Sequence, residues 1–194
     1  MPDWLSRIVP LTEADVPQML LLQEKMLLAL PDKRWYFPNA PEEFAQDTRC
    51  GYACGLWEKG ALIAFGVACA GETHPGGCYA AKVGDESARS FDFRDVIVDP
   101  AWRRQGIHSA FLTFFRRRAE ALGCRAMYAT VDPDNVPSFR SFEKAGFVRL
   151  RVMPAYDGRI RAYYRLCLAM KKHVTQRSDG RSRPFRTFFF YGRP

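Results

Sequence analysis

A short polar segment in the middle of the chain has the composition of an anion site. It follows the apolar run Val96-Ile97-Val98 and the turn-forming pair Asp99-Pro100, and it contains Arg103-Arg104-Gln105-Gly106 before an amphipathic stretch begins. A strand that leads through such a turn into a helix presents backbone N–H groups and the positive end of the helix dipole. Arginine adds charge there. The segment therefore predicts an anion site, with a plain solvated loop as the alternative, and its single glycine fits neither a Walker loop nor a GxGxxG fingerprint.

A second segment, residues 130–147, has polar residues at a regular spacing after the next apolar run. Asn135 follows that run, Ser138 comes three residues later, and a short helix is expected to end before Gly146. The two segments together resemble the GCN5-related N-acetyltransferase (GNAT) superfamily. Residues 103–108 are similar to its acetyl-CoA motif R/Q-x-x-G-x-G/A, and residues 135–147 are similar to N-x-x-A/S-x-x-x-Y-E-K-x-G-F.

The resemblance implies an acyl-CoA N-acyltransferase fold and transfer of an acetyl group from acetyl-CoA, as co-substrate, to an amine acceptor. It implies that backbone groups of the strand bind the thioester and pantetheine, and that N–H groups of the turn hold the pyrophosphate. Asn135 and Ser138 would contact the pantetheine arm or fix the turn beside it. The residues expected to contact acetyl-CoA are Val96, Ile97, Val98, Arg103, Arg104, Gln105, Gly106, Ile107, His108, Ser109, Asn135, Ser138 and Phe142.

Two residues depart from the family pattern. His108 stands where the family has Gly or Ala, and either donates a ring N–H to phosphate or points outward from the first helical turn. Phe142 replaces a tyrosine that often protonates the leaving thiolate, and phenylalanine has no proton to give. Because coenzyme A thiolate is a tolerable leaving group, water can substitute for the missing acid. The substitution also permits a second hypothesis, a non-catalytic acyl-CoA-binding module.

The general base is expected among the acids near the acetyl end. Asp92 and Asp95, in the strand-like run SFDFRDVIV, are equally favoured catalytic candidates, and Glu72 is a further one. In a regular strand Asp92 faces the same side as Val98, and Asp95 faces the other. The alternative is that these carboxylates only pair with nearby arginines. No cysteine lies in either motif, so direct attack in a ternary complex is expected instead of a covalent acetyl-enzyme.

The acceptor side is expected near Trp35, Tyr36 and Phe37, where such folds place an acceptor wall. Glu42 or Glu43 would attract a cationic amine there, although packing is an equally natural role for the three aromatic residues. The sequence does not identify the acceptor.

The elements that must position these residues follow a βα(α)βββαβαββ order. Helices are expected over residues 12–30, 41–49, 105–122 and 137–145, and strands over 7–10, 52–58, 61–70, 91–98, 126–131, 147–153 and 159–170. Residues 71–90 are expected to be a loop, Lys59-Gly60 and Asp157-Gly158 are expected to turn hairpins, and Thr12 with Asp15 is expected to cap the first helix. This predicts one mixed α/β domain, residues 1–170, with a mostly antiparallel, splayed sheet flanked by helices.

The remaining composition limits compartment and partners. The 47% hydrophobic and 14% aromatic content excludes a disordered protein. We expect a cytoplasmic location, free thiols for the six cysteines, no metal and no transmembrane segment, and a homodimer is compatible with the sequence. Residues 171–194 hold seven basic residues and one acid, hence +6 of the formal +8, and end in the aromatic run Phe188–Tyr191. Nucleic-acid contact through this basic tail is a third and weaker hypothesis.

Overall fold

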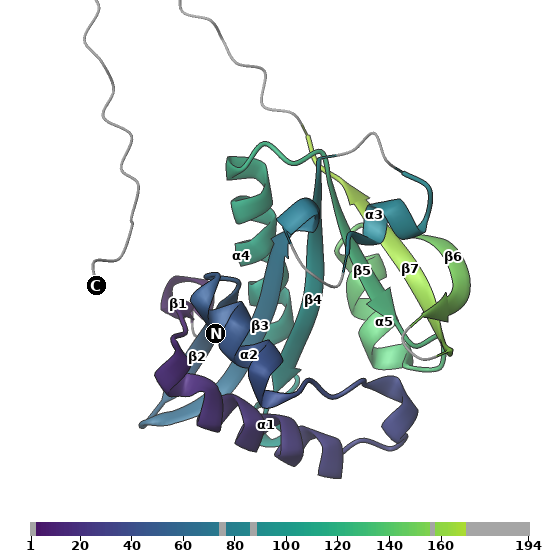
Figure 1. Ribbon diagram of the computed structural model, residues 1–194. Helices are drawn as coiled ribbons and strands as arrows, with labels where there is room; N and C mark the ends of the chain where they lie inside the picture. Colours follow the sequence, from purple (N-terminus) through teal and green to yellow (C-terminus); the bar gives the residue numbers. More distant parts are fainter. Residues whose placement is uncertain (1–2, 74–76, 86–88, 156–157, 170–194) are drawn as a thin grey trace, which may run out of the picture.

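The fold is built on a seven-stranded sheet in the order β1-β2-β3-β4-β5-β7-β6 (Figure 1). The computed structural model describes residues 3–73, 77–85, 89–155 and 158–169. Neighbouring strands are antiparallel except β4 and β5, which are parallel. This confirms the predicted mixed, mostly antiparallel α/β sheet. The strands are β1 (Val9–Pro10), β2 (Ala53–Glu58), β3 (Ala61–Ala70), β4 (Ser90–Val98), β5 (Ala126–Val131), β6 (Val148–Ala155) and β7 (Arg159–Cys167).

Helices cover both faces of the sheet (Figure 1). The helices are α1 (Val16–Leu28), α2 (Pro41–Arg49), α3 (Tyr79–Lys82), α4 (Ile107–Ala121) and α5 (Val136–Lys144). Side chains from α1 and α2 pack in one core cluster with Phe65 and Ile97, whereas α4 and α5 pack on the opposite face with Phe93. The expectation of a loop over residues 71–90 is wrong at α3, which is too short for its hydrophobic periodicity to be recognised.

Local sequence signals set several element boundaries as predicted. The Thr12 backbone N–H donates to Asp15 Oδ2 at 2.7 Å, which completes the capping box before α1. Lys59 and Gly60 both have positive φ angles, 49° and 78°, as a two-residue hairpin turn requires. Helix α4 begins at Ile107, two residues later than expected, because the preceding glycine is left-handed. Asp157 lies outside the described residues, although β6 and β7 do pair as an antiparallel hairpin.

Strand β4 separates from β5 halfway along its length. The two strands pair only from Ser90 to Phe93, against Ala126 to Ala129, and Figure 1 shows them diverging beyond that point. A register shift against β3 occurs at the same place, since Phe93 and Asp95 oppose consecutive residues of β3 and Arg94 has no partner there. Such a bulge bends a strand and shifts its side-chain alternation. The predicted splay is therefore confirmed, and a bulge produces it.

The bulge overturns one prediction about side-chain direction. Phe91, Phe93, Val96 and Val98 all pack on the face covered by α4. Asp92, between the two phenylalanines, therefore points to the opposite face from Val98. The expectation that these two residues share a face is wrong, because strict alternation does not continue through a bulge.

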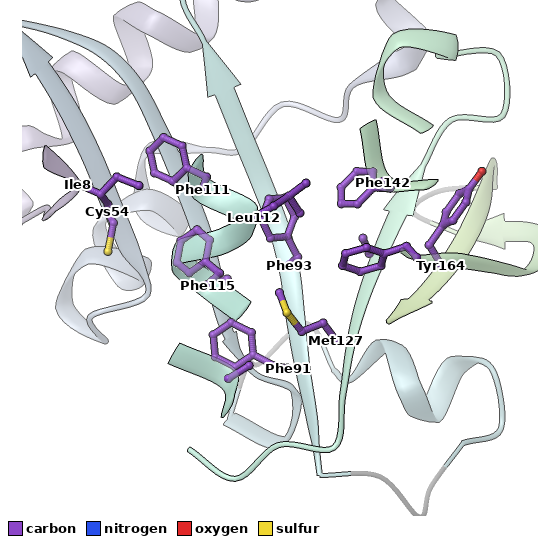
Figure 2. Close-up of a cluster of buried hydrophobic side chains, with 14 of the residues drawn as sticks. Ile8, Cys54, Phe91, Phe93, Phe111, Leu112, Phe115, Met127, Phe142 and Tyr164 are labelled. Carbon is purple, nitrogen blue, oxygen red and sulfur yellow. The ribbon is translucent and has the colours of Figure 1, made fainter. Parts of the chain in front are cut away.

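The core between α4 and the sheet is rich in aromatic residues. Figure 2 shows Phe93 of β4 between the phenylalanines of α4 and Phe142 of α5. The rings of Phe93 and Phe142 meet edge to face with centroids 5.4 Å apart. This contact packs α5 against β4 at Phe93, the last residue of β4 that pairs with β5.

Other expectations concern the surface and the cysteines. No helix among the described residues is long and apolar enough to cross a membrane. Within the same residues no group of three or more His, Cys, Asp or Glu side chains is placed to hold a metal ion. All six cysteines are free thiols: Cys54, Cys69 and Cys124 are buried, Cys78 is partly buried, and Cys50 and Cys167 are exposed. The tail after residue 169 lies outside the described part of the chain.

Candidate functional site

The loop between β4 and α4 is held from both sides while its centre stays exposed. Asp99 accepts hydrogen bonds from the Ala101 N–H and from Lys25 Nζ of α1, at 2.9 and 2.6 Å. Trp4 Nε1 donates to the Gln105 carbonyl at 2.9 Å. All residues from Arg103 to Gly106 are exposed. The loop is therefore anchored at both ends and open to a ligand in between.

The exposed centre of this loop has the hydrogen-bonding properties of an anion site. Among the described residues, the backbone N–H groups from Arg104 to Ser109 donate to no protein acceptor, and the first turn-to-helix bond is from Ala110 to Gly106. Arg104 and Gly106 have positive φ angles of 67° and 82°, which turn the chain sharply into α4. The Arg103 and Arg104 side chains make no hydrogen bond or ion pair within the described residues. Free donors, two arginines and a helix N-terminus together suit a phosphate group.

The edge of β4 that faces β5 is open beyond the bulge. The Asp99 N–H donates to the Ile63 carbonyl of β3 at 2.9 Å. Because N–H groups alternate between the two edges of a strand, those of Val96 and Val98 point toward the open edge. The N–H and C=O of Ile97 point toward β3, so this residue, expected to give backbone contacts, instead contributes a buried side chain. Two strand N–H groups therefore line the gap between β4 and β5.

Helix α5 places the second motif on the other side of the gap. Asn135 is the N-cap residue of α5, and its Oδ1 accepts a hydrogen bond from the Ser138 N–H at 3.2 Å. This geometry matches the expectation that the pair fixes the turn. Phe142 is 4% exposed and packs against Phe93, His108, Phe147 and Tyr164. The ring packs against Phe93, where the β4–β5 pairing ends, in the core cluster that we call the floor of the gap, and it offers no polar atom.

His108 takes neither orientation that the sequence suggested. Its ring lies edge to face with Phe93 and Phe142, at centroid distances of 6.0 and 5.4 Å, and Nδ1 is 2.9 Å from Ser141 Oγ. Burial lowers the pKa of His108 from 6.5 to about 4. The side chain is therefore an uncharged part of the floor at neutral pH and carries no charge toward a phosphate.

A cavity of about 440 Å³ lies on the opposite face of the sheet, beside the bulge. The segment between α1 and α2 supplies one wall, with Trp35, Tyr36, Phe37 and Asn39, and α2 adds Glu43. Three contacts attach this segment to the sheet: Asn39 donates to Asp95, Arg159 donates to the Tyr36 carbonyl, and Arg161 donates to the Arg34 carbonyl. The three aromatic residues predicted for an acceptor wall are thus brought together, as is Glu43, while Glu42 does not line the cavity.

Asp95 is the acid placed in the cavity wall. Its Oδ2 accepts a hydrogen bond from Asn39 Nδ2 at 2.7 Å. The pKa of Asp95 is raised from 3.8 to about 6, chiefly by burial and further by the charge of Asp47, against the hydrogen bond from Asn39. A carboxyl group that is half ionised near pH 6 at the rim of a cavity has the properties of a general base.

Asp92 and Glu72 have different surroundings. Asp92 is completely buried, and its Oδ2 accepts the Tyr79 N–H at 2.9 Å at the start of α3. Glu72 is exposed, and neither acid lines the cavity. Sequence reasoning favoured Asp92 and Asp95 equally, and the structure separates them.

Several residues of the site carried no signal in the sequence. Arg94 and Lys82 line the cavity beside Tyr79. Asn39 contacts Asp95, and Ser141 contacts His108. Arg94 is one of the arginines near Asp92 and Asp95 for which the sequence indicates only a salt-bridge role. An arginine in a strand and a lysine after a glycine-rich stretch are common surface residues, and only the bulge and α3 turn them toward one cavity.

Comparisons with known proteins agree with this architecture. A sequence model of the Acetyltransferase (GNAT) family matches residues 20–147, and no curated protein sequence matches the chain. The ribosomal-protein-S18-alanine N-acetyltransferase from Escherichia coli is 20% identical, with a TM-score of 0.62 over 86% of this chain and 96% of that one. A phosphinothricin acetyltransferase from Sinorhizobium meliloti, solved with AcCoA, is 20% identical, with a TM-score of 0.62 over 87% and 95%. The polyamine N-acetyltransferase from Drosophila melanogaster is 14% identical, with a TM-score of 0.63 over 83% and 99%.

At these identities the solved structures show a shared fold. The family match extends further, because residues 20–147 include the exposed loop before α4, the splayed half of β4, the α5 motif and the first wall of the cavity. The chain belongs to the Acetyltransferase (GNAT) family.

Proposed function

We propose that the protein is an N-acetyltransferase that moves an acetyl group from acetyl-CoA to the amine of an acceptor by direct attack in a ternary complex. The row of free N–H groups from Arg104 to Ser109, next to the open edge of β4, carries this proposal. The row of N–H groups would bind a diphosphate, and the neighbouring edge of β4 would bind an extended chain as another strand does. Acetyl-CoA would supply an acetyl group already activated as a thioester.

Three parts of the chain would contact acetyl-CoA. The N–H groups of the loop, with the Arg103 and Arg104 guanidinium groups, would hold the pyrophosphate. The open edge of β4 would pair with the pantetheine amides as a neighbouring strand does. The N–H of Val98, which points into the gap, would donate to the acyl oxygen and stabilise negative charge there. None of these contacts depends on Phe142 or His108.

Asp95 would act as the general base. It lies in the wall of the cavity, on the segment of β4 that bounds the gap, and its pKa of about 6 leaves it mostly ionised at neutral pH. An ionised carboxylate can remove the proton that the attacking ammonium group must lose. Phe142 and the neutral His108 have no proton for the leaving thiolate, so water would supply it.

The test combines binding with turnover. Calorimetry should detect acetyl-CoA binding, and release of free thiol should accelerate when an amine is added. Replacing Arg103 and Arg104 by glutamine should weaken acetyl-CoA binding, whereas Arg116→Gln, an exposed change elsewhere on α4, should not. A folded protein that gives no binding signal would exclude the function.

The same experiment separates the acetyltransferase from a non-catalytic acyl-CoA-binding module. The module hypothesis draws on Phe142, which lacks the phenol hydroxyl. Saturable acetyl-CoA binding without thiol release, across a broad set of amines, would favour the module.

A further inference from the structure

The acceptor cavity contains both acidic and basic side chains. Its acids, Glu43, Asp47 and Asp95, come from α2 and β4, and its bases are Lys82, Arg94 and Arg161. A site for a simple cationic amine needs only acids, since each base would repel it. The three bases therefore need a separate explanation.

Arg161 is already neutralised within the protein. Its guanidinium forms an ion pair with Asp132 at 2.8 Å and donates to the Arg34 carbonyl at 3.0 Å. Arg161 is buried, with 3% of the residue exposed. Arg161 thus fastens the α1–α2 segment to β7 and has no charge left for a ligand.

Arg94 is placed differently. Its Nη2 donates to the Gly77 carbonyl at 2.7 Å, its guanidinium carbon lies 4.9 Å from the centroid of the Tyr79 ring, and its Nε is buried without an acceptor. Among the ion pairs of the described residues, none includes Arg94. A partly buried guanidinium normally meets a carboxylate. The charge of the buried Asp92 acts on Arg94 without forming an ion pair among the described residues, and the space beside the guanidinium is the cavity.

Lys82 adds a second positive charge at the same end. Its Nζ lies 5.8 Å from the centroid of the Tyr79 ring, so both cations gather around one aromatic side chain. Burial, and then the charge of Arg94, lowers the pKa of Lys82. A negative charge placed between the two cations would relieve their mutual repulsion.

We infer that the acceptor is an amine that also carries an anionic group, such as a carboxylate, which Arg94 and Lys82 bind while the amine faces Asp95. The inference rests on the proposed function, because it assigns the substrate class of that site. A cavity of about 440 Å³ accommodates a molecule of amino-acid size. Arg94 and Lys82, which gather around the Tyr79 ring, would take the anionic group, and Asp95 would take the amine.

The experiment compares acceptors that differ in one charge. Thiol release is measured with a set of L-amino acids, with the carboxamide of each, and with the diamine putrescine. The amino acids should have the highest kcat/KM. Arg94→Gln and Lys82→Met should each raise KM about 10- to 100-fold for the amino acids, since each removes a charge-assisted hydrogen bond, and leave KM for the carboxamides within about twofold. Arg94→Lys should restore part of the loss, and Arg116→Gln serves as control.

A binding measurement makes the result independent of turnover. Calorimetric titration of the preferred amino acid into protein saturated with coenzyme A should show weaker binding in both variants, with acetyl-CoA affinity unchanged. Preference for carboxamides or putrescine, failure of every amino acid to react or bind, or an equal effect of the variants on both acceptor classes would overturn the inference. In all three cases acetyl-CoA binding and transfer to another amine would leave the proposed function standing, whereas loss of acetyl-CoA binding in the wild type would remove the function itself.

Discussion

Replacing Asp95 by asparagine should make the protein less active and more stable. The carboxyl group lies in the cavity wall, where burial is the main cause of its raised pKa of about 6. Asparagine has nearly the same shape and can still accept the Asn39 hydrogen bond through its amide oxygen. It cannot accept a proton, so thiol release should fall by about 10²- to 10⁴-fold, the usual contribution of a general base. In the wild type the rate of thiol release should fall about tenfold per pH unit below pH 6. This acidic limb of the pH–rate profile should be absent from the variant.

The gain in stability follows from the same pKa. A rise from 3.8 to about 6 means that the folded chain favours the protonated carboxyl group. The contribution of Asp95 to stability is therefore complete below pH 3.8 and is lost as the pH rises through 6, up to about 3 kcal/mol. Asp95→Asn removes the cost of ionising this buried group. The free energy of unfolding of the variant should therefore exceed that of the wild type by up to about 3 kcal/mol at pH 8 and equal it near pH 3.5.

Urea unfolding at a series of pH values, beside thiol-release kinetics over the same range, tests both halves of the argument. Asp47→Asn is the matched control, because it removes a like charge that raises the pKa of Asp95. That variant should move the kinetic limb to lower pH while keeping its rate at pH 8. An Asp95→Asn protein that is less stable than the wild type at pH 8, or that keeps the pH limb, would refute the reasoning.

Three further changes address the loop and the floor of the gap. Arg103→Gln with Arg104→Gln should raise the Kd for acetyl-CoA about 10- to 100-fold in calorimetry, and high salt should shrink the difference because both side chains are exposed. Gly106→Ala should cost only about 1 kcal/mol in unfolding experiments, since a Cβ there meets no atom within 4 Å and only the left-handed φ is penalised. A much larger fall in acetyl-CoA affinity would show that ligand occupies that space, and an unchanged affinity would argue against the diphosphate site. His108→Ala should be destabilised by about 2 to 3 kcal/mol at pH 8 through lost ring contacts. The difference in stability from the wild type should shrink as the pH falls from 6.5 to 4, because in this range the imidazole of the unfolded wild-type chain takes up a proton while the ring in the folded chain stays neutral. A constant difference would contradict the lowered pKa.

The parts of the fold that depend on local sequence could be predicted. Capping residues, the Lys59-Gly60 turn and the hydrophobic periodicity of α1 and α4 act over a few residues, so the printed sequence contains their cause. The loop before α4 belongs to the same class, because a turn, a glycine and a following helix are enough to expose backbone N–H groups. Helix α3 could not be predicted, since four residues stabilised by packing against β5 and by Asp92 leave no periodic pattern.

The side-chain directions around the site could not be predicted for a related reason. Side chains along β4 alternate between the two faces on each side of the bulge, but the alternation does not continue across it. The sequence therefore predicted the wrong face for Asp92 relative to Val98. The orientation of His108 depends on the space left between Phe93 and Phe142, residues that are 49 positions apart in the chain. Such tertiary contacts decide burial, and burial is the main cause of the shifted pKa values of Asp95 and His108.

The bulge at Arg94 links the two halves of the proposed reaction. It coincides with the end of β5 pairing, so the edge of β4 is free from this point onward. It also brings Arg94 and Asp95, which are adjacent in sequence, into the wall of one cavity, although a regular strand would direct them to opposite faces. One irregular residue thus lies where the edge proposed for acyl-CoA begins, and it sets a cation and the proposed base side by side in the proposed acceptor cavity. Restoring a regular register by deleting Arg94 should therefore abolish acetyl-CoA binding and acceptor binding together, whereas the substitutions Arg94→Gln and Asp95→Asn should affect the acceptor side alone.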